Sequence, residues 1–160
     1  MPNLPALEAF AADLLARLEP AARQELARRI ARELRASQQK RIAAQLNPDG
    51  SGFAPRKPQL RPGGSTLGVR QQKGKIRNQM FAKLRTAKHL KAKGSTDTAV
   101  VAFTDQVSRI ARVHQFGLRD KVNRKTGLET DYPERQLLGI SEADETLIRD
   151  LAVEYLAGRS

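Results

Sequence analysis

"DTAVVAFT", residues 97–104, is the clearest strand signal in the chain. The stretch is short, rich in β-branched side chains and bounded by turn-forming residues. Most of the sequence around it instead repeats its apolar residues at helical spacing. The order of helices, this strand and further short strands predicts an α+β fold, with a helical N-terminal half, a small antiparallel sheet and a C-terminal helix.

The sequence after this strand predicts a helix, a hairpin and a last helix. The first of these is expected over residues 105–116, with Thr104 as its N-cap. Residues 121–122 and 128–130 are expected to pair as a hairpin. The last helix is expected to begin after Ser141, which has an acidic residue three positions further on, as in a capping box.

The sequence before the strand predicts three helices. The first 46 residues are expected to form two of them, with a break near Glu19, because Pro20 is tolerated in the first turn of a new helix. The third is expected over residues 71–93, where apolar residues recur at spacings of four, four and three, and Gly94 is expected to end it.

A long connection separates the second of these helices from the third. Residues 47–65 contain four prolines and four glycines, a composition typical of turns and loops. We expect an extended, weakly ordered connection there, and a basic Pro/Gly-rich loop at about 47–70. The length of 160 residues suits one domain, so residues 1–160 are predicted to form a single domain.

The positive charge of the chain is concentrated in residues 50–96, which we call the basic span. The formal net charge is +12, and the basic span holds twelve basic residues and no Asp or Glu. The rest of the chain carries 17 basic and 17 acidic residues, so it is neutral. Such a span attracts a polyanion such as nucleic acid, or an acidic protein surface. The alternative is a solvated basic arm with no specific partner.

The composition excludes several kinds of site. The chain has no cysteine, which excludes disulfides, thiolate metal sites and a cysteine nucleophile. Its two histidines, His89 and His114, have no further ligands at metal-binding spacing, so no metal site and no cofactor are predicted. No apolar run approaches the roughly 20 residues that span a bilayer, and we expect a soluble protein made in the cytoplasm, with no membrane partner.

No set of residues has the pattern of a catalytic site. The glycine-rich stretches lack the lysine and the Ser or Thr of a phosphate-binding loop. A nuclease would need clustered carboxylates for Mg²⁺, and the basic span has none. His114 lies on the apolar face of its predicted helix, one turn before Gly117, so we interpret it as a packing residue at the helix end. The sequence predicts no enzyme.

Four motifs occur in order along the chain. They are "RIAAQLNPDGSGFAPRK" (41–57), "KIRNQMFAKLR" (75–85), "RIARVHQFG" (109–117) and "YPERQLLGIS" (132–141). This order and wording resemble the phage virion morphogenesis family, the tail completion proteins of tailed phages, from about Leu7 to Leu156. Each motif is short, and the four in sequence are much more specific than any one of them.

The resemblance implies a non-enzymatic structural protein that completes the tail or neck and enables head–tail joining. The family carries no catalytic residues, so none are assigned. The resemblance also implies assembly in the host cytoplasm, a final place in the tail or neck of the virion, and other tail and neck proteins as partners. The expected assembly is a homo-oligomeric ring around the DNA channel, with six-fold symmetry favoured.

Two sets of site residues follow from this interpretation. Non-specific contacts with DNA in the channel, or with an acidic partner, are expected from Arg56, Lys57, Arg61, Arg70, Lys73, Lys75 and Arg77. Structural roles are expected for His114, Gly117, Pro133, Arg135, Leu137 and Leu138, of which the two leucines are predicted to be mostly buried and to fix the last helix to the core. The alternative function is a basic nucleic-acid-binding accessory protein that contacts phosphates.

Overall fold

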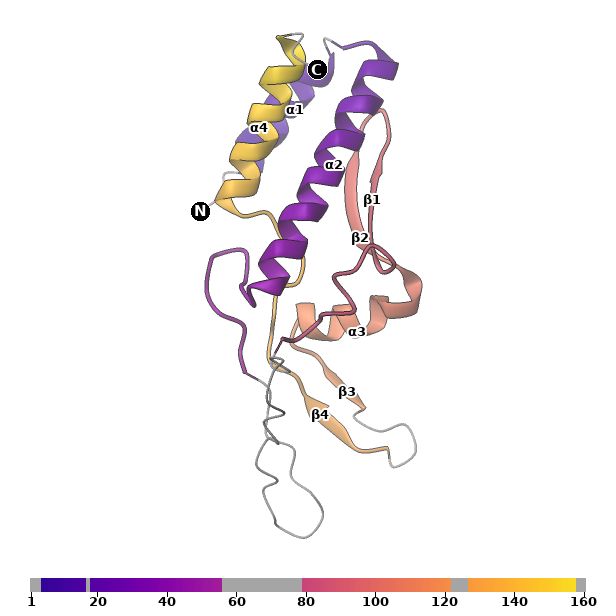
Figure 1. Cartoon of the computed structure of the whole chain (residues 1–160), viewed down its shortest axis with the longest axis vertical. Coiled ribbons are helices and arrows are strands. Elements are labelled where there is room, and N and C mark those ends of the chain that lie inside the picture. Colours follow the sequence, from indigo (N-terminus) through magenta and orange to yellow (C-terminus); the bar gives the residue numbers. More distant parts are fainter. Residues whose placement is uncertain (1–3, 17, 56–78, 122–126, 158–160) are drawn as a thin grey trace, which may run out of the picture.

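The computed structural model of the chain describes residues 4–16, 18–55, 79–121 and 127–157. Within them the chain forms, in order, α1 (Leu4–Ala16), α2 (Pro20–Ala43), β1 (Leu90–Gly94), β2 (Ala99–Phe103), α3 (Asp105–Gln115), β3 (Arg119–Lys121), β4 (Glu129–Asp131) and α4 (Glu142–Leu156). The predicted α+β class is confirmed, since helices lie at the two ends of the sequence and strands in its middle (Figure 1). None of the helices in these ranges is long and apolar enough to cross a membrane.

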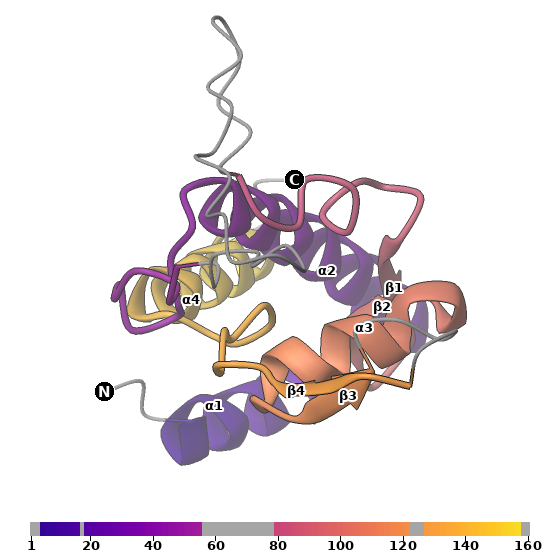
Figure 2. The same ribbon diagram turned by 90° about the horizontal axis from the view of Figure 1, so that it is seen from below.

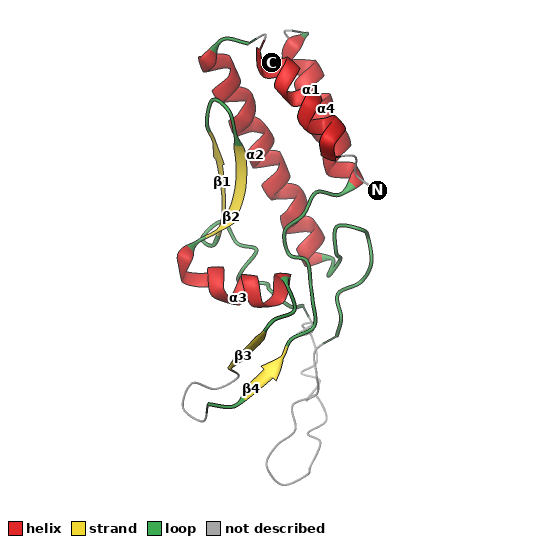
Figure 3. Cartoon of the chain, turned by 180° about the vertical axis from the view of Figure 1, so that it is seen from behind, coloured by secondary structure: helices red, strands yellow, loops and turns green. Residues whose placement is uncertain are grey.

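The long helix α2 lies between two layers. The helices α4 and α1 lie on one side of it, and the hairpin β1–β2 lies on the other (Figures 1 and 3). The helix begins at Pro20, as predicted. The backbone N–H groups in the first turn of a helix have no partner within the helix, so proline, which lacks this N–H, is tolerated there. Its buried apolar residues are Leu26, Ala27, Ala31, Leu34 and Ile42. Two of these are alanines, whose small side chains allow neighbouring elements to approach the helix closely.

The strand β1 shows that the helix predicted over residues 71–93 is wrong over its described part, residues 79–93. Residues 79–89 form a series of turns, and β1 follows them and pairs antiparallel with β2, while residues 71–78 lie outside the described residues. The apolar residues that gave the helical pattern, such as Met80 and Leu84, reach the core from these turns. Pairing with β2 and packing on α2 decide the structure here, because tertiary contacts override weak local propensities.

Gly94 lies where β1 contacts α2, and it does not end a helix as predicted. A Cβ atom at this position would lie 2.4 Å from the backbone nitrogen of Arg28. The absence of a side chain therefore lets the strand lie directly against the helix backbone. In the hairpin, Gly94 pairs with Ala99 and Leu90 pairs with Phe103.

The elements predicted after β2 are confirmed, with small shifts of their ends. The helix α3 follows Thr104, although the Thr104 side chain makes no capping hydrogen bond. The strands β3 and β4 form the predicted antiparallel hairpin. Before α4, the Ser141 Oγ accepts a hydrogen bond from the Asp144 backbone N–H at 3.2 Å, and the Asp144 Oδ2 accepts one from the Ser141 backbone N–H at 3.0 Å. This is the predicted capping box.

The connection after α2 is more ordered than predicted over residues 47–55. Its backbone turns back on itself, and Leu46 forms an isolated antiparallel bridge with Gly52. The Asp49 Oδ1 accepts a hydrogen bond from the Ser51 N–H at 2.9 Å, and the Asn47 N–H donates to the Ser51 carbonyl at 2.8 Å. A proline- and glycine-rich composition thus indicates a tight turn here, and local side-chain hydrogen bonds define it.

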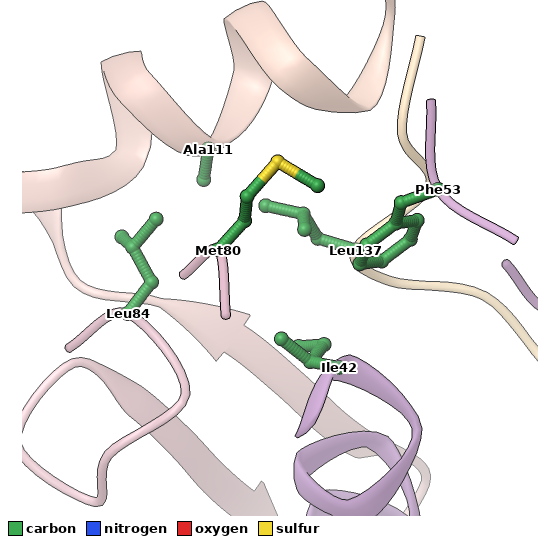
Figure 4. Close-up of a cluster of buried hydrophobic side chains, with 6 residues drawn as sticks. All are labelled: Ile42, Phe53, Met80, Leu84, Ala111 and Leu137. Atoms are coloured by element: carbon green, nitrogen blue, oxygen red, sulfur yellow. The ribbon is translucent and has the colours of Figure 1, made fainter. Parts of the chain in front are cut away.

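The buried apolar residues form two clusters at different heights along α2. The larger cluster contains Ile42, Phe53, Met80, Leu84, Ala111 and Leu137, which come from α2, α3 and the segments between elements (Figure 4). The smaller cluster joins α2 to α4 through Leu26 and Ala152, with Tyr155 packed against them. The larger cluster therefore holds together residues that are far apart in the sequence.

Charge is divided between the two layers that flank α2. The helices α1 and α4 contain seven acidic residues and one basic residue. Residues 79–94, which include β1, contain five basic residues and no acidic residue. One side of the molecule is therefore acidic and the opposite side is basic.

Candidate interaction site where the four motifs meet

Side chains from all four motifs meet beside the larger core cluster. The Phe53 and Phe81 rings pack edge to face with centroids 5.8 Å apart, and the Phe81 ring packs on His114 at 4.8 Å. The His114 ring in turn packs on Tyr132 at 5.0 Å, and Arg135 contacts His114. We call these five residues the motif cluster. Because Phe53 and Phe81 flank residues 56–78, the chain enters and leaves that segment at one place.

Arg135 of the motif cluster holds the chain just before residue 56. Its side chain is buried, with 3% of its surface exposed. Its Nε donates a hydrogen bond to the Ala54 carbonyl at 2.7 Å, and its Nη2 donates to the Pro55 carbonyl at 3.0 Å. The planar guanidinium offers several donors in fixed directions, so one side chain can bind two successive carbonyls.

Gln45 holds the chain just after residue 78. Its side-chain Oε1 accepts a hydrogen bond from the Met80 N–H at 2.8 Å, and its Nε2 donates to the Met80 carbonyl at 3.0 Å. Its own carbonyl accepts from the Phe53 N–H at 2.7 Å. One residue just after α2 therefore binds both flanks of residues 56–78. Gln45 adopts a positive φ of 62°, which turns the chain sharply after the helix.

His114 is a half-buried member of the motif cluster. Its Nδ1 lies 3.2 Å from the Arg135 Nη1. A guanidinium group only donates hydrogen bonds, so Nδ1 is the acceptor in this contact and the ring proton lies on Nε2. Within the described residues, no group of three or more His, Cys, Asp or Glu side chains is placed to hold a metal ion. The geometry at His114 is that of a packed ring.

The last motif is bound by polar side chains from α2 and α3. Arg41 donates to the Gln136 carbonyl at 2.9 Å and to the Leu137 carbonyl at 3.0 Å. Gln115 exchanges two hydrogen bonds of 2.9 Å with the backbone of Leu138. Leu137 is fully buried, as predicted, whereas Leu138, which was also predicted to be mostly buried, is only half-buried. Burial lowers the pKa of Arg41, and the nearby charge of Asp144 opposes this shift.

Gly117 and Pro133 lie where the end of α3 meets the last motif. Gly117 has a φ of 60°, and a Cβ atom there would lie 2.9 Å from the backbone nitrogen of Glu134. A glycine is therefore required on two counts, its backbone conformation and the close approach of another segment. Pro133 is half-buried next to this contact.

The seven basic residues predicted to contact DNA or a partner lie outside the described residues. They are Arg56, Lys57, Arg61, Arg70, Lys73, Lys75 and Arg77. Sequence reasoning missed Arg41, Gln45 and Gln115, which bind the flanks and the last motif. The only sequence signal for their roles is their position inside two of the four motifs. Polar residues near the end of an amphipathic helix otherwise look like residues of its solvent-exposed face.

Comparison with known proteins gives one consistent result. Residues 3–157 match the model of the phage virion morphogenesis family. The chain is 40% identical over 144 residues to the tail completion protein S of Escherichia phage P2, and the alignment covers 89% of this chain and 90% of that protein. No solved structure matches the chain significantly. The family-model match over nearly the whole chain and this identity show that the chain belongs to the phage virion morphogenesis family.

Proposed function

We propose that the chain is a structural protein that completes the phage tail or neck and enables the joining of heads to tails. The observation that carries the proposal is the identity with tail completion protein S over nearly the whole of both chains. The match to the family model over residues 3–157 supports it. The role is one of assembly, without a catalytic step, and its site is the virion after assembly in the host cytoplasm.

The motif cluster supports a specific use of residues 56–78. Both flanks of this segment are hydrogen-bonded to one region of the fold, through Arg135 and Gln45. The segment itself contains seven basic and no acidic residues. Salt screens an exposed charge beyond roughly 8 Å at physiological ionic strength, so these charges gain most against a polyanion or an acidic protein. In this proposal they contact DNA in the channel or an acidic neighbour.

The proposed assembly is a homo-oligomeric ring that binds other tail and neck proteins. A ring repeats one heterologous interface and closes when the rotation between subunits fits. Six-fold closure is proposed because the tail of a phage is commonly six-fold. The division of charge across α2 supports a head-to-tail contact between copies, since it gives each copy one acidic and one basic side.

Electron microscopy of particles made without this protein tests the proposed function. Separate heads and tails are expected, and supplying the protein in trans is expected to restore joined particles. Normal joined particles in its absence would contradict the proposal. A variant in which all seven basic residues of segment 56–78 become Gln is expected to fold and to leave heads unjoined. The control changes exposed basic residues away from β1, Lys40, Arg112 and Lys121, to Gln.

The second candidate function is a nucleic-acid-binding accessory protein, and the same uncompensated charge favours it. Binding that rests on phosphate contacts weakens with salt, with a slope in log K against log[salt] of about −0.9 per phosphate contacted in duplex DNA. Tight, steeply salt-dependent DNA binding, together with normal particles in the absence of the protein, would favour this candidate over tail completion.

A further inference from the structure

The helix α1 exposes an apolar surface to solvent. Among its described side chains only Leu7 is buried, while Leu4 and Phe10 keep 43% and 38% of their surface exposed. The helix lies against α4 and away from β1 (Figures 1 and 2). Residues 4–16 contain two exposed acidic residues, Glu8 and Asp13, and no basic residue. A short helix in water is stabilised mainly by packing of its apolar face, and the exposed Leu4 and Phe10 leave part of the apolar surface of α1 uncovered.

A groove between α2 and β1, on the side of α2 away from α1, is lined by small residues and cations. This α2–β1 groove has a volume of about 870 Å³. Its small lining residues are Ala21, Ala92 and Gly94, and its cations are Arg28, Arg32 and Lys93. Arg28 and Arg32 are four residues apart on α2, so they lie one above the other on one helix face.

The cations of the groove carry no ion pair within the described residues. Arg28, Arg32 and Lys93 are exposed, and none takes part in a salt bridge there. The one carboxylate that lines the groove, Glu25, accepts a hydrogen bond from the Tyr155 hydroxyl at 3.3 Å, and Tyr155 belongs to α4 on the other side of α2. The groove therefore carries three cations against one carboxylate, and its net charge is positive.

We propose that α1 of one copy of the chain binds in the α2–β1 groove of a second copy. This inference rests on the assembly proposed above and names its interface. Glu8 and Asp13 would face Arg28, Arg32 and Lys93, and the apolar side chains of α1 would cover the alanines and the glycine of the groove. An amphipathic helix that lays its apolar face in a groove is a recurrent mode of recognition.

The placement of the two surfaces makes this contact head to tail. The helix α1 lies on the other side of α2 from β1 (Figure 2), and the groove is lined by residues of α2 and β1, so one copy offers its helix to one neighbour and its groove to another. Such a heterologous contact repeats and closes into a ring when the rotation fits. The acidic side of one copy then meets the basic side of the next, which steers association and selects this orientation.

Cysteine cross-linking tests the contact, because the chain has no cysteine of its own. Ala12→Cys on α1 and Ala92→Cys in the groove are prepared as separate proteins, mixed and treated with a short thiol cross-linker. A covalent dimer from this mixture is the expected result. The control replaces Ala92→Cys by Ala102→Cys on β2, whose side chain is exposed. Equal cross-linking to Ala102→Cys would overturn the proposal. So would a double variant Ala12→Cys/Ala92→Cys that cross-links only within one chain.

Charge reversal tests the electrostatic part of the contact. Arg32→Glu and Glu8→Arg are each expected to weaken self-association at least about tenfold in sedimentation experiments, because each places like charges together. Combined in one chain, they are expected to restore association to within a few-fold of the unmodified protein. The control, Arg112→Glu, changes an exposed arginine on α3 by the same charge. Unchanged self-association of Arg32→Glu would overturn the proposal. So would an Arg32→Glu protein that loses DNA binding but keeps its self-association.

Failure of this interface and failure of the proposed function are distinguishable in assembled particles. Joined particles in which the Ala12→Cys and Ala92→Cys positions do not cross-link would overturn the α1–groove contact and leave tail completion intact. Normal joined particles made without the protein would overturn the proposed function itself. Joined particles that yield the expected cross-link between neighbouring copies would support both.

Discussion

At the scale of single residues, Arg135 and His114 join the motif cluster through defined hydrogen bonds and ring contacts. Arg135 is buried and donates to two successive backbone carbonyls, and His114 is packed between two aromatic rings and accepts from Arg135. The sequence singled out both residues within motifs. It did not reveal their contact, because 21 positions separate them and only the fold brings them together.

Replacement of Arg135 by Met is expected to lower the free energy of unfolding by about 3 kcal/mol. The methionine fills the volume but leaves the Ala54 and Pro55 carbonyls without their donor, and a buried unsatisfied group costs roughly 1–3 kcal/mol. Urea denaturation measures the change. The control, Arg112→Met on the exposed surface of α3, is expected to stay within about 0.5 kcal/mol of the unmodified protein. Equal stabilities of the two variants would contradict the role of Arg135.

His114→Asn is expected to lower stability by about 1–3 kcal/mol, since it removes two ring contacts that each contribute roughly 0.5–1.5 kcal/mol. Thermal unfolding measures the loss. Particle joining at a permissive temperature is expected to persist, because packing and not a chemical step is lost. One metal ion per chain in elemental analysis of the purified protein, lost in His114→Asn, would contradict this interpretation.

At the scale of elements, most helices and the β2 strand were predictable, and β1 was not. Helix starts have local signals, such as Pro20 in a first turn and Ser141 in a capping box, so sequence alone locates them. The strand β1 has no such signal. Its pairing with β2 and its contact with α2 at Gly94 arise only in the folded chain. The apolar spacing before it equally suits turns that place Met80 and Leu84 in the core.

Gly94→Ala is expected to cost about 1–3 kcal/mol, the usual penalty for overpacking. The added Cβ would lie 2.4 Å from the Arg28 backbone nitrogen, and a helix backbone cannot move as a flexible side chain would. The matched control is Gly52→Ala, where nothing lies within 4 Å of the added atom. Chemical denaturation of both variants gives the comparison. A Gly94→Ala protein as stable as Gly52→Ala would contradict the close contact of β1 with α2.

Leu137→Ala is expected to lower stability by about 2–5 kcal/mol, as typical for a fully buried leucine. The same change at the neighbouring Leu138 is expected to cost less, because Leu138 is only half-buried. The difference between the stability losses of Leu137→Ala and Leu138→Ala, measured in the same denaturant, reports how much more Leu137 contributes to packing against the larger core cluster. Equal losses would show that Leu138 packs more completely than the structure places it.

At the scale of the whole molecule, the sequence predicted the fold class and the four motifs but not the place where they meet. The polar residues that bind the flanks of residues 56–78, such as Gln45, resemble any solvated helix residue in sequence. Their partners are backbone groups, which leave no trace in the pattern of side chains. The family membership follows from the motifs, and the geometry of the motif cluster required the structure.

We propose that residues 1–160 unfold as one domain. The two core clusters are both built on α2, through Leu26 in one and Ile42 in the other, so disruption of either removes packing from the same helix. A single calorimetric transition, with equal calorimetric and van't Hoff enthalpies, is expected. Two resolved transitions would contradict the proposal. Leu137→Ala, which affects one cluster only, is expected to shift the whole transition and not to split it.

The division of acidic and basic residues across α2 also gives the molecule an electric dipole moment. In the field of a second copy, a torque would turn the side of β1 toward the acidic α1 and α4 of that copy. Each subunit would thus arrive already oriented, and the rate of productive encounters would fall steeply as salt is added. Assembly would then be selective in its kinetics, before any contact between surfaces has formed.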